Sequence, residues 1–352
     1  MTNKNIINLY SKKETKENAI EFNKFFSGLE HQAKKQAFSE KKCFICGREA
    51  RFCNSHSLPR FVLKHIAQSG MVANSMCMAE NTILAAETGI NNTGTFHLIC
   101  ADCDSREFAD YENPDNYNDK PTQIMLSQIA QKSYLKEIYK QTKNIELHNL
   151  VYQIYNSKIG NLQELAFLDK ADYIKQYLYA KNTKEPYFLV YYKCLPYTVP
   201  MASQTRVALI SGFNGEIINN VYDLNPNALL EDLHICVFPM KAKSIIMMFV
   251  RNGQKRLRPF YRDFLKMPED QQLQVLTYII LSYSEEVFFS KPLIGQISDL
   301  SKLGHICGQT SMFNGYKDDA KARLRELAQE YNLSNAKNIP NLLSTVYSVK
   351  ND

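Results

Sequence analysis

The chain reads Cys-Phe-Ile-Cys at residues 43–46 and Cys-Ala-Asp-Cys at residues 100–103, two Cys-x-x-Cys pairs separated by 53 residues. Four thiolates arranged as a tetrahedron are the ligands that structural zinc (Zn²⁺) prefers, and each pair supplies two of them. Because four thiolates leave no open coordination position for substrate, this zinc would be structural. The alternative is a set of buried free thiols at coincidental spacing. The predicted ligands are Cys43, Cys46, Cys100 and Cys103.

A second group of residues lies around these pairs. Ser55 and His56 stand between them, with Pro59 three residues after the histidine, and Asp104 follows the second pair at once. The order Cys-x-x-Cys, polar-His-x-x-Pro, Cys-x-x-Cys-polar resembles the zinc-braced branch of the HNH, or ββα-metal, nucleases. The resemblance covers about residues 41–112.

The resemblance implies a role for each of three residues. His56 would be the general base for a water that attacks phosphorus, and a histidine with a pKa near 6.5 suits that task at neutral pH. Ser55 and Asp104 would occupy the two positions that hold a catalytic divalent cation. A hard cation that prefers oxygen ligands, Mg²⁺ or Mn²⁺, is the implied cofactor.

Two positions depart from the family pattern. Ser55 replaces the usual aspartate, and Asp104 replaces the usual asparagine, so the carboxylate on the helix would keep the single negative charge of the site. Asp104→Asn is therefore expected to abolish metal-dependent cleavage. The family asparagine that orients the histidine has three candidate positions by spacing: Thr95, Asn91 and Asn92.

His56 also has a simpler interpretation. It could be a zinc ligand, since Cys53 lies three residues before it, or a capping histidine on a module that has lost activity. His97 is expected to be a packing residue on a short strand that leads into Cys100. His65 is expected to be solvated or structural.

The net charge of +6 is unevenly distributed. Residues 1–66 carry 13 Lys and Arg against 6 Asp and Glu, whereas residues 67–120 carry 2 against 9. Contacts to nucleic acid would therefore depend on local patches of basic side chains, which bind phosphates. Near the predicted site these side chains are Arg51, Arg60, Lys64 and Arg106.

A second basic run lies far along the chain, with the aromatic residues Phe260 and Tyr261 among its cations. Basic and aromatic side chains together can track and stack nucleic acid. A solvated strand edge guarded by charges explains the pattern equally well. The cations are Arg251, Lys255, Arg256, Arg258 and Arg262.

Local patterns predict an α+β protein in two parts. Residues 1–118 would form an N-terminal helix and a small zinc-stapled ββα module, and residues 119–352 a larger mixed domain, with a turn-rich boundary at 113–118. Helices are expected at 17–38, 59–66, 121–141, 162–179, 271–281 and 318–331. Strands are expected at 187–192, 206–218, 233–238 and 244–250, the second of them bent at Asn214-Gly215. The isolated cysteines are expected to be core thiols: Cys77, Cys194, Cys236 and Cys307.

These features predict a metal-dependent HNH-like endonuclease, a hydrolase of phosphodiester bonds. DNA is favoured over RNA because the resemblance is to enzymes that cut DNA, and the architecture resembles bacterial antiviral and mobile-element nucleases. The larger part would sense, dimerise or bind a target, giving a homo-oligomer or a complex with a partner protein through residues 119–352. The alternative is a non-catalytic zinc-stabilised protein that binds nucleic acid or protein.

Other function classes find no support in the sequence. The longest unbroken apolar run, at 245–250, is far too short to span a membrane, so no membrane partner is expected. Because no apolar leader follows the first residues, we expect a cytoplasmic protein. The chain has no serine-elbow, dinucleotide or His-Glu-x-x-His motif, which argues against the common hydrolase, dehydrogenase and zinc-protease classes.

Overall fold

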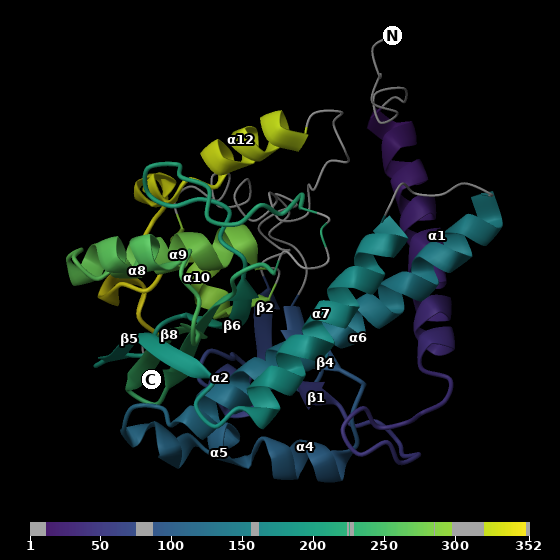
Figure 1. Ribbon diagram of the computed structural model, residues 1–352, viewed down its shortest axis with the longest axis horizontal. Coiled ribbons are helices and arrows are strands. Elements are labelled where there is room, and N and C mark those ends of the chain that lie inside the picture. Colours follow the sequence, from purple (N-terminus) through teal and green to yellow (C-terminus); the bar gives the residue numbers. More distant parts are fainter. Residues whose placement is uncertain are drawn as a thin grey trace.

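The protein is described by a computed structural model that covers residues 12–74, 87–155, 162–223, 225, 229–284, 286–297 and 320–349. It combines helices and antiparallel sheets, which confirms the predicted α+β class (Figure 1). The first half contains α1 (Lys12–Ala37), β1 (Ser55–His56), α2 (Arg60–Lys64), β2 (Met71–Asn74), β3 (Glu87–Gly89), β4 (Thr95–Phe96), α4 (Ala101–Glu107), α5 (Ala109–Glu112), η2 (Pro114–Asn118), α6 (Gln123–Tyr155) and α7 (Leu162–Asn182). The second half contains β5 (Tyr187–Leu195), β6 (Met201–Val207), β7 (Leu233–Met240), β8 (Lys243–Arg251), α8 (Arg258–Phe264), α9 (Glu269–Tyr283), β9 (Val287–Phe289), α10 (Lys291–Gln296), α12 (Ala320–Glu330), η3 (Leu333–Asn338) and η4 (Thr345–Tyr347).

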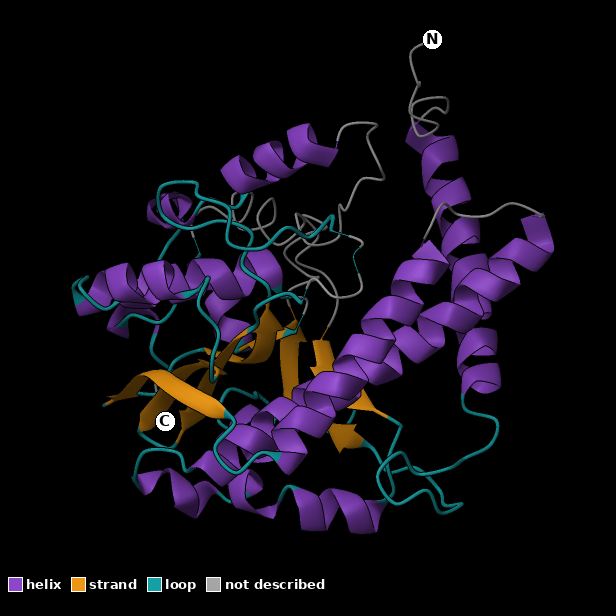
Figure 2. Ribbon diagram, viewed as in Figure 1, coloured by secondary structure: helices purple, strands orange, loops and turns teal. Residues whose placement is uncertain are grey.

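A seven-stranded antiparallel sheet with the order β3-β2-β9-β6-β7-β8-β5 forms the centre of the molecule (Figure 2). Its inner strands β7 and β8 are almost completely buried, which explains why both sequences are mainly apolar. Along β7, Ile235 and Val237 contact one hydrophobic core, whereas Cys236 and Phe238 contact another. The sheet is therefore covered on both faces, as the alternation of strand side chains requires.

Different elements cover the two faces of the sheet. On one face, α8, α9 and η3 pack against alternate residues of β7 and β8. On the other face, α6 packs together with α2, α4 and the cysteine loops. The N-terminal helix α1 is more peripheral and contacts α6, where Leu29 and Ala33 meet Leu147 and Leu150. The four-cysteine region is thus built directly onto the central sheet through α6.

Strands from both predicted parts share this sheet. β2 pairs with β9 through Ala73 and Phe289, so a strand of the N-terminal part lies within the larger sheet. The expected boundary segment forms η2, whose Tyr117 is buried and contacts the ring of Phe238. In the residues described, the two parts share the hydrophobic core on one face of the sheet. The division at residue 118 stays a prediction.

Most predicted elements are present, with one clear correction. Residues 206–218 are not one bent strand: β6 ends at Val207, and only an isolated bridge joins Ser211 to Ile217 across the turn at Gly215. The asparagine–glycine signal located the turn correctly, and Gly215 has the positive φ of +76° that such turns need. The helix expected at 121–141 is longer, because α6 continues to Tyr155.

The isolated cysteines have two different environments. Cys236 is a buried core thiol on β7, as expected. The prediction was wrong for Cys194, which lies on the edge strand β5 and is exposed. Cys77 and Cys307 lie outside the described residues. Within the described residues, no helix has the length and apolar character needed to cross a bilayer.

Candidate metal centre and adjacent acid cluster

The four predicted metal ligands come together from two separate loops. The first pair lies in a tight turn that Gly47 closes by donating its N–H to the Cys43 carbonyl at 2.8 Å, with a positive φ of +69°. The second pair lies at the start of α4, where Cys100 precedes the first helical residue. A hydrogen bond from Phe44 N to Leu98 O at 3.1 Å ties the two loops together.

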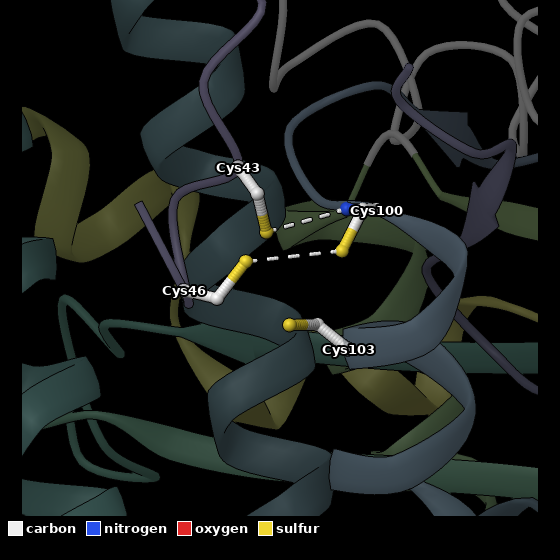
Figure 3. Close-up of side chains that lie close together, drawn as sticks. All are labelled: Cys43, Cys46, Cys100 and Cys103. Carbon is white, nitrogen blue, oxygen red and sulfur yellow. Dashed lines mark hydrogen bonds between the residues drawn. The ribbon is translucent and has the colours of Figure 1, made fainter. Parts of the chain in front are cut away.

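The sulfur atoms converge on one point (Figure 3). All four Sγ atoms lie within 4.8 Å of one another, and the Sγ atoms of Cys46 and Cys100 are 4.0 Å apart. Sulfurs at the corners of a tetrahedron around zinc would be about 3.8 Å apart, given zinc–sulfur bonds of about 2.3 Å. Four cysteines are therefore close enough to bind one metal ion.

The cysteines of the cluster differ in their surroundings. Burial raises the pKa of Cys103 to about 12, and the neighbouring sulfurs add to this effect. A buried thiol of this kind becomes a thiolate only when a positive charge compensates it. Cys46 is at the open side, where hydrogen bonding with Arg48 lowers its pKa to about 6.

The two strands of the predicted ββα module also meet. β1 pairs with β4 in antiparallel register, with Ser55 opposite Phe96 and His56 opposite Thr95, and α4 follows directly after the second cysteine loop. This arrangement brings two predicted site residues together: the buried Ser55 hydroxyl donates to Asp104 Oδ1 at 2.7 Å.

A lysine that the sequence analysis did not single out completes this cluster. Lys132 of α6 is fully buried, and its ammonium forms an ion pair with Asp104 Oδ1 and another with Glu112 Oε1 at 3.0 Å. The ammonium also lies 4.0 Å from the centre of the Phe108 ring. Two carboxylates and one ammonium leave a net charge of −1 when both acids are ionised, although burial raises the pKa of Glu112 above its ordinary value.

His56 is partly buried beside the acid cluster. Its Nε2 atom lies 3.0 Å from the carbonyl oxygen of Ile90, and in a neutral ring this nitrogen donates the hydrogen bond. Burial is the largest effect on its pKa and lowers it, and the charges of Lys132 and Arg60 act in the same direction. The imidazole is therefore neutral at physiological pH, with its lone pair on Nδ1.

The group that orients His56 differs from the expected ones. Within the described residues, the imidazole makes no hydrogen bond to the side chains of Thr95, Asn91 or Asn92, and its partner is the main-chain carbonyl of Ile90. His97, expected to be a packing residue, bonds to Asn54 Oδ1 at 2.7 Å through Nε2.

The predicted phosphate contacts are all on the surface. Arg51, Arg60 and Lys64 are exposed, and within the described residues none of them is paired with a carboxylate. Arg106 is exposed too, but its guanidinium pairs with Glu107 at 2.9 Å. The first three cations are therefore the ones free to meet phosphates near β1 and α2.

The sequence contained one usable signal for Lys132. It lies three residues after Ile129 and seven after Met125, on the apolar face of α6, so helical spacing places it toward the core. Its partners could not be read from the sequence, because Asp104 and Glu112 lie 28 and 20 residues earlier on other helices.

Compared with protein-family models, curated proteins and solved structures, the chain matches none of them.

Proposed function

We propose that the four cysteines bind one structural Zn²⁺ ion. The support is the geometry of the cluster: four sulfurs converge at separations that suit a tetrahedral thiolate site, and soft thiolate ligands favour zinc in such a geometry. With all four positions taken by sulfur, the ion would hold the 43–46 turn against the start of α4. It would position the module and take no part in the reaction.

We propose further that residues 41–112 act as an HNH-like endonuclease module that hydrolyses phosphodiester bonds, with DNA as the favoured substrate. One observation carries this proposal: β1 pairs with β4, α4 begins shortly after β4, and this strand–strand–helix arrangement brings the Ser55 hydroxyl to 2.7 Å from Asp104 Oδ1, with His56 next in the chain. Two of the three residues that the family resemblance selected, Ser55 and Asp104, are therefore in contact, and the third, His56, is the neighbour of Ser55 in the chain. Exposed unpaired cations at Arg51, Arg60 and Lys64 suit a phosphate backbone.

In this proposal His56 is the general base. Its Nε2–H is held by the Ile90 carbonyl, which leaves Nδ1 to accept a proton from the attacking water. Mg²⁺ or Mn²⁺ would supply positive charge to the departing 3′ oxygen. Asp104 would hold such a hydrated ion, because its side chain is 20% exposed and Mg²⁺ keeps several of its waters when it binds one or two carboxylates. The fully buried Ser55 would act through the hydrogen bond that its hydroxyl donates to Asp104 Oδ1.

The remaining parts of the prediction extend the same proposal. A small nuclease module joined to a larger part of the chain fits bacterial antiviral defence, with residues 119–352 sensing a signal, dimerising or binding a target. This assignment rests on analogy of architecture, since fold and context alone do not determine function.

A second candidate function is supported by Lys132. Its ammonium already lies between Asp104 and Glu112, where it supplies the positive charge that a divalent ion would bring. A site with its own internal cation is compatible with a non-catalytic, zinc-stabilised protein that binds nucleic acid or another protein. In that case Ser55, Asp104 and Lys132 would form a structural network.

Cleavage of supercoiled plasmid separates the two candidates. The nuclease proposal expects nicking by the purified protein with Mg²⁺ or Mn²⁺, its suppression by chelation of the added ion, and at least a hundredfold loss in His56→Ala, the usual scale for removing a general base. His65→Ala is the matched control, because His65 is another partly buried histidine nine residues further on, at the end of α2. It should cut at the wild-type rate.

The opposite result is equally informative. Equal cutting by wild type and His56→Ala, or no cutting with either ion, contradicts the nuclease proposal. Slower migration of uncleaved plasmid in a mobility-shift measurement would then support the second candidate, a non-catalytic binding protein.

A further inference from the structure

A hollow at the free edge of the central sheet is separate from the candidate metal centre. It has a volume of about 580 Å³ and lies where the β8–α8 turn meets the edge strand β5. Sites for small ligands typically measure roughly 300–1,000 Å³. The second basic run of the sequence supplies much of its lining.

The lining carries concentrated positive charge. Arg251, Arg258 and Arg262 line the hollow, and no carboxylate is among its described lining residues. Arg258 is exposed, and no described carboxylate pairs with it. Arg251 is held in place because its guanidinium donates to Gln176 Oε1 at 3.0 Å and lies 3.6 Å from the centre of the Tyr179 ring. Arg251 and Arg258 have no acidic partner within the described residues, whereas the exposed Arg262 lies with its Nε atom 3.5 Å from Asp263 Oδ1. Guanidiniums gathered in this way suit an anion, and their planar donors match phosphate oxygens.

The lining also presents aromatic surface. Phe188 is 51% exposed although it is a large apolar side chain, and its ring centre is 6.3 Å from that of Tyr261 at an interplanar angle of 47°. The two rings are too close together to admit a third ring between them, so a planar ligand would stack on the open face of Phe188. Gln254 adds a polar group, since its Oε1 atom is buried without a hydrogen-bond partner in the described structure.

We propose that this hollow, the β5–α8 pocket, binds a nucleotide unit, with the phosphate on Arg258 and Arg262 and the base stacked on Phe188. The combination decides the ligand class: guanidiniums alone would accept any anion, whereas an exposed aromatic face and an unpaired amide oxygen suit a planar base that bears N–H groups. A free nucleotide and one residue of a polynucleotide strand share this chemistry.

The position of the pocket relates it to the metal centre through α7. Gln176 and Tyr179 contact Arg251 of the pocket, whereas Tyr177 packs edge-on against Phe44 of the first cysteine turn, with ring centres 5.4 Å apart. Lys181 forms an ion pair with Glu107 of α4 at 3.2 Å. Four side chains within residues 176–181, about 9 Å of helix length, therefore contact the two regions between them. The binding proposal itself does not depend on nuclease activity.

Binding measurements on the intact protein test the proposal. The probes are a fluorescein-labelled short oligothymidylate, followed by anisotropy, and unlabelled thymidine 5′-monophosphate, thymidine, inorganic phosphate and polyglutamate as competitors. Chelator in every sample prevents cleavage, so that failure of the nuclease proposal leaves this result unaffected. If thymidine 5′-monophosphate competes at about the same concentration as the oligonucleotide, counted per nucleotide, the ligand is a free nucleotide. If the oligonucleotide binds much more tightly than the mononucleotide, the ligand is one residue of a polynucleotide strand.

Three variants locate the site. Arg258→Gln and Phe188→Ala should each weaken binding about tenfold, through loss of a charge-assisted contact and of a stacking surface respectively. Both side chains are exposed enough for folding to tolerate the changes. Arg325→Gln, on α12, removes the same charge from another exposed arginine outside the pocket and should bind as wild type does.

Three outcomes would overturn the proposal. The first is that the wild type binds neither the labelled oligothymidylate nor thymidine 5′-monophosphate. The second is that Arg258→Gln or Phe188→Ala binds as tightly as Arg325→Gln. The third is competition by phosphate or polyglutamate as effective as that by the nucleotide, which would make the pocket a general anion or acidic-peptide site.

Discussion

Lys132 shows how far a single side chain can depart from its usual environment. Lysine is among the residues least often buried, because removing an ammonium from water costs several kcal/mol. Here the ammonium has two carboxylates and an aromatic face around it. Those partners belong to α4 and α5, so the lysine ties α6 to the cysteine-bearing region.

Replacement of Lys132 by methionine should destabilise the protein strongly. Lys132→Met keeps the length and apolar stem of the side chain but leaves Asp104 and Glu112 without their cation. We expect a loss of roughly 3 kcal/mol in the free energy of unfolding, the scale found when one partner of a buried pair is removed. Denaturant unfolding followed by circular dichroism measures this change.

The matched control lies on the same helix. Lys143 pairs with Glu30 at 2.9 Å, but both side chains are partly exposed, so Lys143→Met should cost less than about 1 kcal/mol. If the two variants were equally stable, the ion pairs of Lys132 would contribute no more than surface pairs.

At the scale of elements, two loops and one helix start depend on the cysteine cluster. The first turn contains no regular secondary structure beyond isolated bridges, among them Lys42 to Glu49, and β1 and β4 have only two residues each. Elements this short cannot order themselves, because a two-stranded pair is marginal in water. We therefore expect the metal ion to supply much of the local stability.

Metal content provides the corresponding prediction. Purified protein should contain one zinc per chain by elemental analysis, and Cys103→Ser should lose it and become sensitive to proteolysis around residues 41–112. Cys53→Ser is the control, because Cys53 lies nearby but donates its thiol hydrogen to the Ile99 carbonyl and is outside the cluster. Zinc retained in Cys103→Ser, or lost equally in both variants, contradicts the assignment of ligands.

At the scale of the whole molecule, the helices α6 and α7 enclose a polar group against the central sheet. His234 of β7 is buried, with its ring stacked on Phe249 at 4.7 Å between centres and the Tyr134 hydroxyl 3.4 Å from Nε2. Arg206 and Asp232 form a 2.6 Å ion pair beside it. Burial, reinforced by the charge of Arg206, lowers the pKa of His234 to about 3.

This lowered pKa predicts an acid-sensitive fold. The histidine is neutral in the folded protein, but below its ordinary pKa of about 6.5 it takes up a proton on unfolding. Its contribution to the free energy of unfolding is therefore fully present above pH 6.5 and is lost as the pH falls toward 3. The free energy of unfolding falls by about 1.36 kcal/mol per pH unit in this range, or about 2 kcal/mol between pH 6.5 and pH 5. Unfolding free energies at pH 7 and pH 5 should therefore differ by about 2 kcal/mol more in wild type than in His234→Gln.

The exposed His31 on α1 provides the control for that comparison. His31→Gln should keep the pH dependence of the wild type. An unchanged pH dependence in His234→Gln would mean that the imidazole is not the group that titrates.

The amino-acid sequence alone was enough to predict the four clustered cysteines, most of the long helices and the turn at Gly215. In each case the signal is local: a Cys-x-x-Cys spacing, a helical repeat or an asparagine–glycine pair restricts the backbone within a few residues. It also selected Ser55, His56 and Asp104 through the family resemblance, and the structure places Ser55 against Asp104. Their catalytic roles stay predictions.

Only the tertiary structure decided which distant groups meet. Lys132 between Asp104 and Glu112, the Ile90 carbonyl on His56, and β2 beside β9 are contacts between segments that no local pattern links. Residues 206–218 illustrate the same limit, since their strand-like composition yields to the packing of the chain around Gly215. Local propensities amount to fractions of a kcal/mol per residue, whereas burial and ion pairing across the core contribute several, so the long-range contacts prevail.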